Sequence, residues 1–242
     1  MFMKIKEIFY AVLPRGLKNS ITRRQLLKQN YSYISFAQEG EDKILEKYFD
    51  EHRNSGFFVD IGANHPYNFS NTYKFYLKGW RGMNIDAIPG TKKLFDTLRP
   101  GDINVETGIS MNTGVSDFYI FEQSIFNTFD IKKAAEHCRE FSLTVKEVIK
   151  IKTNRLSEVL DNYLPASQKI DFISVDVEGL DMEVLLSNDW LNYKPEVILI
   201  ECLHSNLEEI GNIEAVTYLR QLGYKLFAKT FNTLFFSIKS DA

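Results

Sequence analysis

The segment Phe57–Tyr76 reads FFVDIGANHPYNFSNTYKFY, and its first six residues decide how the rest of the chain is interpreted. Three apolar residues run directly into Asp60, and one further apolar residue precedes Gly62. A buried strand that ends on a carboxylate is costly unless another group pairs with the acid. We therefore expect Asp60 to organise a turn by accepting hydrogen bonds, and Gly62 to let the backbone approach a ligand closely.

Short apolar runs alternate along the chain with segments of helical periodicity. This alternation is typical of a mostly parallel sheet with helices on both faces, and the last two strands read as a hairpin. The expected strands are residues 56–62, 82–86, 102–110, 115–122 (an edge strand), 147–154, 170–179, 195–204, 224–229 and 233–239. The expected helices are residues 39–49, 70–79, 90–99, 130–143, 155–164, 180–190 and 213–223. The sequence therefore predicts a doubly wound α/β fold.

The composition fits one large α/β domain. The 242 residues are 44% hydrophobic, which is ample for a single packed core. The net charge of −3 argues against broad nucleic-acid binding, which needs a basic face. Cys138 and Cys202 form no C-x-x-C pair, so a disulfide scaffold is disfavoured and a reducing cytoplasm is the simpler location. No apolar run reaches membrane-spanning length.

The start of the chain differs from the rest in charge. Residues 1–30 contain seven Lys and Arg but a single Glu, with apolar residues at helical spacing. Such a segment can lie as a helix on an anionic membrane surface. It can also be a basic arm that packs on its own domain or on a second copy of the chain, and the usual solvation of charge runs favours this reading. We therefore predict a basic arm over residues 1–30 and one folded domain over residues 31–242, with peripheral membrane contact and a homo-oligomer left open.

Acidic residues gather where the expected strands end. In open parallel sheets, ligands bind outside the carboxyl ends of the strands. The residues at these ends are Asp60, Gly62, Asn64, Asp86, Ala87, Glu106, Gly108, Asp176, Glu178, Glu201 and His204. So many carboxylates exceed what packing requires, because each is expensive to bury unpaired.

The type of ligand follows from the missing glycines in the loop after the first expected strand. The dinucleotide fingerprint G-x-G-x-x-G is absent, because DIGANHPYN has a single glycine. Asp86 ends the second strand, which is the position where an acid binds the hydroxyls of an adenosine ribose. An adenosine cofactor without a pyrophosphate therefore fits better than a dinucleotide, and a sulfonium charge suits the acidic strand ends.

Several motifs in order carry a family resemblance. They are SFAQEGEDKIL, FVDIGANHPYNFSNTYKFYLKGWRGMNIDAIPG, INVETGIS, FNTF and IDFISVDVEGLDMEVLLSNDW. From about Tyr33 to the C-terminus the chain resembles the FkbM family of S-adenosylmethionine-dependent methyltransferases. The resemblance implies the class I methyltransferase fold, a Rossmann-like sheet of seven strands of which the last is antiparallel. It also implies S-adenosyl-L-methionine as cofactor.

The resemblance assigns cofactor-binding roles by position. It places the cofactor loop at Asp60, Gly62 and Asn64, and the ribose contact at Asp86 and its neighbour Ala87. The residues expected near the adenine are Glu106 and Ser110, and those expected to cap the cofactor are Gln38 and Glu41. Many family members carry Glu where this chain has Asp86, a change that keeps the charge and shortens the reach.

The residues expected to act on the methyl acceptor can be interpreted in more than one way. Asp176 is the expected general base for an acceptor hydroxyl, with His65 and His204 as competitors. Asp176, Glu201 and His204 could instead hold a divalent metal, or His204 could be an ordinary loop histidine. Glu178 either faces the substrate or caps the following helix. The segment Phe126–Phe129 mixes aromatic and amide groups, so Asn127 and Thr128 are candidate sugar contacts in what could equally be an apolar lid.

The resulting prediction is a cytoplasmic O-methyltransferase. Its expected acceptor is a hydroxyl of a sugar, nucleotide- or lipid-linked, in glycan or secondary-metabolite biosynthesis; this step comes from the family resemblance. One alternative is a metal-assisted methyltransferase of another small molecule. Another is a module that binds the adenosyl cofactor without turnover.

Overall fold

The computed structural model describes residues 33–203 and 206–239. Residues from Ser35 onward form one compact unit, and the description below concerns that unit. The predicted basic arm, residues 1–30, lies outside the described residues, and so does His204. Among the helices of the described part, none has the length and apolar composition that crossing a bilayer requires.

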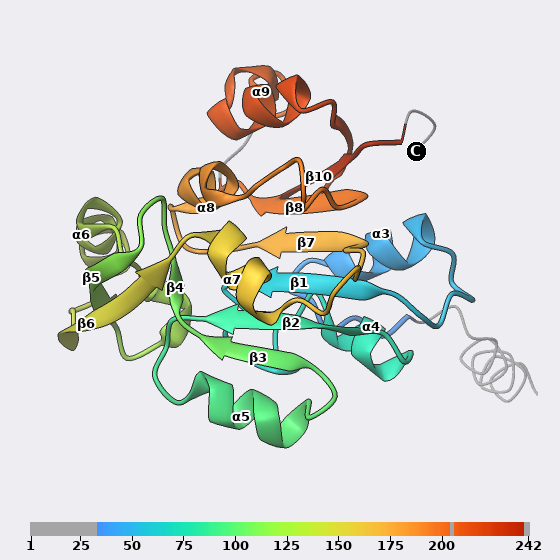
Figure 1. Cartoon of the computed structure of the whole chain (residues 1–242). Coiled ribbons are helices and arrows are strands. Elements are labelled where there is room, and N and C mark those ends of the chain that lie inside the picture. Colours follow the sequence, from blue (N-terminus) through green and yellow to red (C-terminus); the bar gives the residue numbers. More distant parts are fainter. Residues whose placement is uncertain (1–32, 204–205, 240–242) are drawn as a thin grey trace, which may run out of the picture. The chain divides into compact units, whose positions relative to one another are not determined.

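The main sheet has seven strands in the order β3-β2-β1-β7-β8-β10-β9 (Figure 1). The five strands from β3 to β8 in this order are parallel to one another, and β10 is antiparallel to both β8 and β9. The strands are β1 (Phe57–Ile61), β2 (Arg81–Asp86), β3 (Ile103–Glu106), β7 (Phe172–Val175), β8 (Val197–Glu201), β9 (Lys225–Lys229) and β10 (Thr233–Ser237). The predicted mostly parallel sheet with an antiparallel closing hairpin is confirmed, and it has the strand order of a Rossmann-like methyltransferase.

Helices cover both faces of the main sheet, as the alternation predicts (Figure 1). They are α3 (Glu41–Tyr48), α4 (Tyr73–Leu77), α5 (Thr91–Leu98), α7 (Leu156–Tyr163), α8 (Asp181–Ser187) and α9 (Glu214–Gln221), with a short 3-10 helix η2 (Ile210–Asn212). Side chains alternate between the faces along each strand. In β1, Phe57 and Val59 pack with α7 and α8, whereas Phe58 packs with α3 and α4. This alternation turns Asp60 toward the same face as Phe58.

An aromatic cluster fills the core beneath α3 and α4. Phe172 is fully buried and its ring lies 5.1 Å from that of Phe75 and 5.8 Å from that of Phe58. Trp80 contacts the rings of Phe75 and Phe172 and is also fully buried. Burial of each such side chain contributes on the order of 2 kcal/mol. The cluster fixes α3 and α4 against the sheet, and with them the segments that lead into the strand ends.

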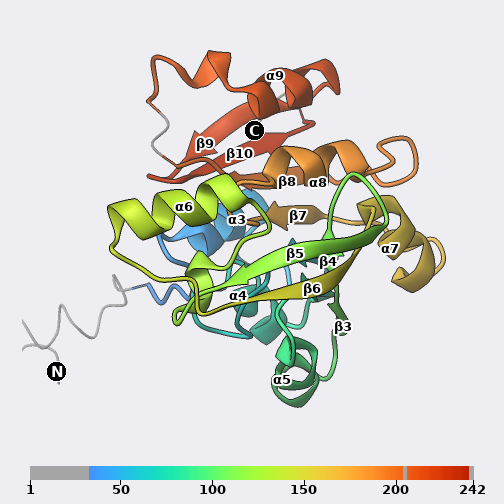
Figure 2. The ribbon, with the colours of Figure 1, turned by 90° about the vertical axis from the view of Figure 1, so that its left-hand side faces the viewer.

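A small second sheet lies across the carboxyl ends of the central strands (Figure 2). Its order is β4-β6-β5, made of β4 (Gly108–Ile109), β5 (Gly114–Ile120) and β6 (Glu147–Asn154). The chain between β5 and β6 forms a 3-10 helix η1 (Ser124–Phe126) and helix α6 (Ile131–Glu140). We call residues 121–141 the insert. Figure 2 shows α6 beside this sheet, on the side of the molecule toward which β1 and β7 point in Figure 1.

The small sheet corrects one prediction about the strands. Residues 102–110 were expected to form a single strand, but the chain leaves the main sheet at Thr107 and continues as β4 in the second sheet. The hydroxyl of Thr107 donates to the carbonyl of Lys152 at 3.0 Å, and its amide donates to the carbonyl of Asp86 at 2.8 Å. Thr107 is thus bonded to both sheets at the crossing. β5 is an edge strand as expected, but of the small sheet.

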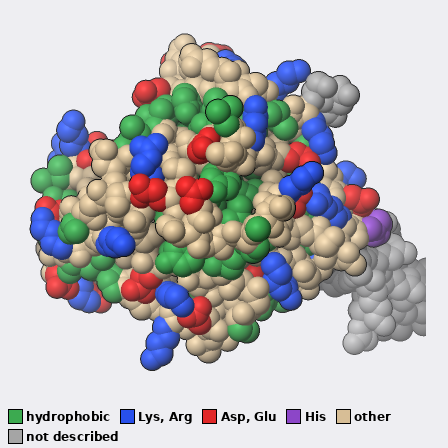
Figure 3. All heavy atoms as spheres, viewed as in Figure 1, with side chains coloured by type: hydrophobic (Ala, Val, Ile, Leu, Met, Phe, Trp, Pro, Cys, Tyr) green, Lys and Arg blue, Asp and Glu red, His purple; other side chains and the backbone are tan. Residues whose placement is uncertain are grey.

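Surface charges on the face drawn in Figure 3 are mixed. Lys and Arg side chains are interspersed with Asp and Glu, and hydrophobic side chains show between them toward the middle of that face. No broad area of one sign is visible there. This distribution fits a small net charge spread over a globular surface.

Candidate active site

A cavity of about 390 Å³ opens at the carboxyl ends of β1, β2, β7 and β8. The strand ends line it together with the loop from Gly62 to Thr72, which we call the first loop, and with the insert. This is the position where open α/β sheets bind ligands. The sheet thus brings together side chains that are more than a hundred residues apart, such as Asp60 and Glu201.

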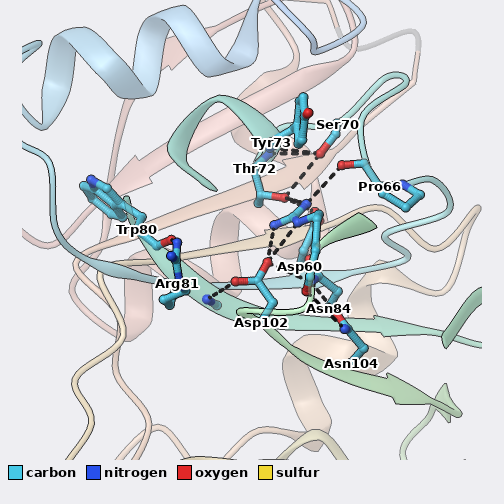
Figure 4. Close-up of polar contacts among 12 residues, drawn as sticks. Asp60, Pro66, Ser70, Thr72, Tyr73, Trp80, Arg81, Asn84, Asp102 and Asn104 are labelled. Carbon is cyan, nitrogen blue, oxygen red and sulfur yellow. Dashed lines mark hydrogen bonds and ion pairs between the residues drawn. The ribbon is translucent and has the colours of Figure 1, made fainter. Parts of the chain in front are cut away.

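Asp60 is buried and paired, which answers why the strand can end on an acid. Its side chain is 6% exposed and accepts a hydrogen bond from the Thr72 hydroxyl at 2.7 Å (Figure 4). Arg99 donates to the same hydroxyl at 3.0 Å. Burial raises the pKa of Asp60, and the Thr72 hydrogen bond and the Arg99 charge oppose that rise. Asp60 therefore organises the first loop, as predicted for the turn.

A buried ion pair supports the contact between Asp60 and Thr72. Arg99 is fully buried, and its Nη2 lies 2.7 Å from Oδ2 of Asp102. Arg99 also donates to the carbonyl of Pro66 at 3.3 Å. Asp102 accepts from the amide of Gly82 at 3.0 Å. Because charges buried without partners are very costly, these contacts tie the first loop to β2 and to the end of α5.

Gly62 is required by both its conformation and its surroundings. Its φ is +81°, in the region that favours glycine, and a Cβ there would stand 1.7 Å from the carbonyl oxygen of Asp176. The first loop therefore crosses directly against the end of β7. This close approach leaves the backbone of Gly62 exposed to the cavity.

Asp86, the last residue of β2, holds the first loop in place through hydrogen bonds. One carboxylate oxygen accepts from the amide of Asn64 and the other from the amide of Ile88, each at 2.7 Å. Burial raises the pKa of Asp86 to about 6, although these two hydrogen bonds oppose the rise. Each oxygen keeps a second lone pair, so the carboxylate can still accept from a ligand hydroxyl.

Three carboxylates cluster on the other side of the cavity. Oxygen atoms of Asp176, Glu178 and Glu201 lie within 4.8 Å of one another. Burial raises the pKa of Asp176 well above its usual value, and the charge of Glu201 raises it further. Burial also raises the pKa of Glu178 to about 7 and that of Glu201 to about 8. The cluster therefore exchanges protons near neutral pH, or can share a cation.

Two hydrogen bonds join the insert to other segments around the cavity, and a third lies within the insert. Ser124 donates to Oδ1 of Asn64 at 2.9 Å, which joins the insert to the first loop. Thr128 donates to the carbonyl of Glu178 at 3.0 Å, which joins it to the segment after β7. Asn127 accepts from the amide of Phe121 at 2.8 Å. The polar groups of Asn127 and Thr128 thus hold the insert in place.

Most of the residues selected from the sequence meet at this cavity. Those that line it are Gln38, Asp60, Gly62, Asn64, Asp86, Ala87, Asn127, Asp176, Glu178 and Glu201. The helix cap considered for Glu178 is not formed, because α8 is preceded by Leu180 without a side-chain cap. The ligand roles assigned to these residues stay predictions.

Five selected residues lie outside the cavity lining. Glu41 accepts from the Thr233 hydroxyl at 3.1 Å, and Glu106 accepts from the amide of Gly90 at 2.8 Å. Ser110 donates to Glu183 at 3.1 Å, and Nδ1 of His65 accepts from the amide of Asn68 at 3.1 Å. Thr128, described above, is the fifth. In this structure their polar groups stabilise turns and contacts around the site. His204 lies outside the described residues.

Several cavity residues carry no signal in the sequence. His137 on α6 is 3% exposed, and its Nδ1 lies 3.2 Å from the carbonyl of Phe126, which can only accept. Its Nε2 lies 4.0 Å from Glu178. Asn71 donates to the Ser174 hydroxyl at 3.0 Å. A lone histidine on a helix gives no reason for selection, and Asn71 lies in the loop after β1 without a pattern of its own, so only the fold shows that both residues reach the cavity.

Fold and site together define a Rossmann-like enzyme with an acidic ligand cavity at the strand ends. A family model, the methyltransferase FkbM domain, matches residues 60–226 of this chain. The match spans more than half of the chain, so the protein belongs to the FkbM methyltransferase family and is a methyltransferase. The resemblance drawn from the sequence motifs is thereby confirmed. A search of curated proteins finds no match.

Replacing Gly62 by Ala should destabilise the fold by roughly 2 kcal/mol or more, because the new Cβ meets the Asp176 carbonyl in a strained backbone. Denaturant unfolding measures the loss. Gly223→Ala is the matched control, since Gly223 also has a positive φ (+91°) but nothing within 4 Å of its Cβ position. Equal losses in the two variants would contradict the steric explanation.

Glu201→Gln should stabilise the protein at pH 8.5 and have little effect at pH 5. The pKa of Glu201 is raised to about 8, so the folded state keeps a proton that the unfolded chain releases near pH 4.5. The parent therefore loses stability as pH rises between these values, by roughly 1.4 kcal/mol for each pH unit that separates the two pKa values, and glutamine removes that loss. Thermal unfolding in a chelating buffer measures it. A pH-independent difference would contradict this assignment.

Proposed function

We propose that this protein is an S-adenosylmethionine-dependent O-methyltransferase that acts on a hydroxyl of a sugar or glycan precursor. The observation that carries the proposal is the cavity itself. Acids from four parallel strands converge on it, and the first loop reaches it with one glycine in place of a phosphate-binding glycine-rich turn. Family membership supports methyl transfer. The choice of a sugar, and of a cytoplasmic biosynthetic setting, follows the family resemblance.

Three features fit an adenosyl sulfonium cofactor. Gly62 lines the cavity without a side chain, and Asp86 keeps lone pairs for ribose hydroxyls. The acidic lining favours a positively charged ligand. In this proposal Asp60, Gly62, Asn64, Asp86 and Ala87 hold the cofactor, with Gln38 covering it. When bound, S-adenosylmethionine would supply a methyl group to an acceptor oxygen, with the C–S bond breaking as the C–O bond forms and S-adenosylhomocysteine leaving.

The protein must orient the acceptor hydroxyl and take its proton. Asp176 lies at the end of β7 against the first loop, and its raised pKa makes its carboxylate a stronger proton acceptor than an ordinary Asp. Glu201 and Glu178 stand within reach to share or pass on that proton. Activity should therefore rise with pH as the cluster loses protons. Positioning supplies the remainder of the rate enhancement.

A metal-assisted version of the reaction is the second candidate. The spacing of the Asp176, Glu178 and Glu201 oxygens, within 4.8 Å of one another, suits a divalent cation that prefers oxygen ligands. Such a cation would hold the cluster ionised and could bind the acceptor oxygen. Loss of turnover in EDTA, restored by Mg²⁺ or Mn²⁺, would favour this version; unchanged turnover would remove it.

Asp86→Ala should weaken the binding of S-adenosylhomocysteine by about 10-fold or more, because the ribose contact and the support of the first loop are both lost. Isothermal titration calorimetry measures the affinity. Glu51→Gln, an exposed acid outside the cavity, is the control and should bind as the parent does. Unchanged affinity in Asp86→Ala would remove the assignment of Asp86 as a ligand.

Asp176→Asn should lower kcat by roughly 10²- to 10⁴-fold, because the amide cannot accept the proton. The assay uses labelled cofactor with a panel of sugars and detects the gain of one methyl by mass spectrometry. Affinity for S-adenosylhomocysteine should stay close to that of the parent. Full turnover in this variant would exclude Asp176 as the base, and failure of the parent to bind S-adenosylhomocysteine would refute the proposed function.

A further inference from the structure

The cavity has two halves that differ in surroundings. One half, around Asp60, Gly62 and Asp86, is the proposed cofactor site. The other half, which we call the acceptor half, lies between the Asp176–Glu178–Glu201 cluster, the end of the first loop and the insert. Asn71 reaches β7 through its hydrogen bond to Ser174, which places the end of the first loop beside this second half.

Charge in the cavity disfavours an anionic acceptor. The acidic lining residues are Asp60, Asp86, Glu140, Asp176, Glu178 and Glu201. Within residues 33–203 and 206–239, Lys133 is the one Lys or Arg that lines the cavity. A diphosphate would bring two or more negative charges into a cavity where, among the described Lys and Arg residues, Lys133 alone could pair with them, and each lining carboxylate that is ionised would repel those charges strongly in a site partly shielded from water. A sugar without charge meets no such penalty.

Exposed apolar side chains of the first loop and the insert also line the cavity. Phe69 is 63% exposed, Phe141 is 54% exposed and Ile125 is 43% exposed, yet all three line the cavity. We call these three residues the apolar rim. Exposed apolar groups that border a polar site mark a surface that contacts an apolar partner. Behind the rim, Phe126 packs against Phe141 with ring centroids 5.2 Å apart, so the rim rests on a fixed base.

The backbone at Phe69 is strained, which points to a role for its ring. Its φ is +53°, a conformation that a bulky aromatic residue rarely adopts. Ser70 holds the turn, because its amide donates to the carbonyl of Phe36 at 2.9 Å and its hydroxyl accepts from the amide of Tyr73 at 3.1 Å. Glycine would fit this position without strain. Strain kept at the edge of a ligand cavity indicates a functional side chain.

We propose that the acceptor is an uncharged sugar linked to an apolar group, and that this group lies against the apolar rim of Phe69, Ile125 and Phe141. This inference rests on the proposed function and narrows it. The sugar hydroxyl enters toward the carboxylate cluster, and the apolar group leaves through the opening. Sugar nucleotides are excluded as the preferred acceptor. An alkyl chain and an aromatic aglycone offer the same apolar chemistry, and the experiment separates them.

The experiment first titrates the full-length protein with S-adenosylhomocysteine, which tests the proposed function by itself. The saturated protein is then titrated with methyl, octyl and phenyl glycosides of common hexoses, below micellar concentrations, and with the matching nucleotide diphosphate sugars. For at least one hexose, the octyl or phenyl glycoside should bind about 10-fold tighter than the methyl glycoside. The nucleotide sugars should bind no tighter than the methyl glycosides. The better of the octyl and phenyl series identifies the kind of apolar group.

Variants at the rim test which residues cause the preference. Phe69→Gly removes the ring and also relieves the backbone, so its melting temperature should stay level or rise while the preference falls to within about 2-fold. Phe141→Ala should reduce the preference in the same way. Tyr163→Ala on α7 is the control: Tyr163 is 51% exposed, is not a lining residue, and its loss should leave the preference intact.

Several results would overturn the inference while the proposed function stands. These are S-adenosylhomocysteine binding together with equal affinity for methyl, octyl and phenyl glycosides, or with no glycoside binding, or with nucleotide sugars binding most tightly. A full preference in Phe69→Gly and Phe141→Ala would show that the rim is not the contact. Failure of S-adenosylhomocysteine itself to bind would instead refute the proposed function.

Discussion

The buried pair of Arg99 and Asp102 is the constraint on which the site depends. Both side chains are removed from water, so each must satisfy its charge with partners inside the protein. Arg99 does so by bonding to Thr72 and Pro66, and Thr72 in turn bonds to Asp60 (Figure 4). The first loop therefore cannot move away without leaving buried N–H groups of Arg99 without their hydrogen-bond partners. A loop held this firmly can present Gly62 and Asn64 to a ligand in one arrangement.

Burial also sets the chemistry of the carboxylates. The same low-polarity surroundings raise the pKa of Asp86, Glu178 and Glu201, and each acid then makes its neighbours harder to ionise. A cavity of this kind binds cations well and holds protons close to neutral pH. Both properties suit the proposed reaction, in which the donor is positively charged and the acceptor loses one proton. In that proposal the acids bind the donor on one side of the cavity and take the proton on the other.

The insert gives the enzyme its second wall. Its hydrogen bonds to Asn64 and to the carbonyl of Glu178 fasten it to segments that belong to two different strands of the main sheet. The small sheet from which it projects is itself joined to the main sheet at Thr107. The cavity is therefore bordered by the strand ends of the main sheet on one side and by the insert of the small sheet on another.

The sequence by itself determined the class of fold and the position of most acids at one edge of the sheet. Local patterns suffice for this, because alternation of apolar runs and helical segments is a property of neighbouring residues, and strand ends follow from it. Tertiary structure alone decided the partners. Arg99 and His137 contact residues that are distant in sequence, and Phe69 has a backbone conformation that no local pattern predicts. The side chains expected at the cofactor but found in hydrogen bonds with other groups near the site are those of Glu41, Glu106 and Ser110. No local pattern encodes such contacts, since they depend on which distant segments pack together.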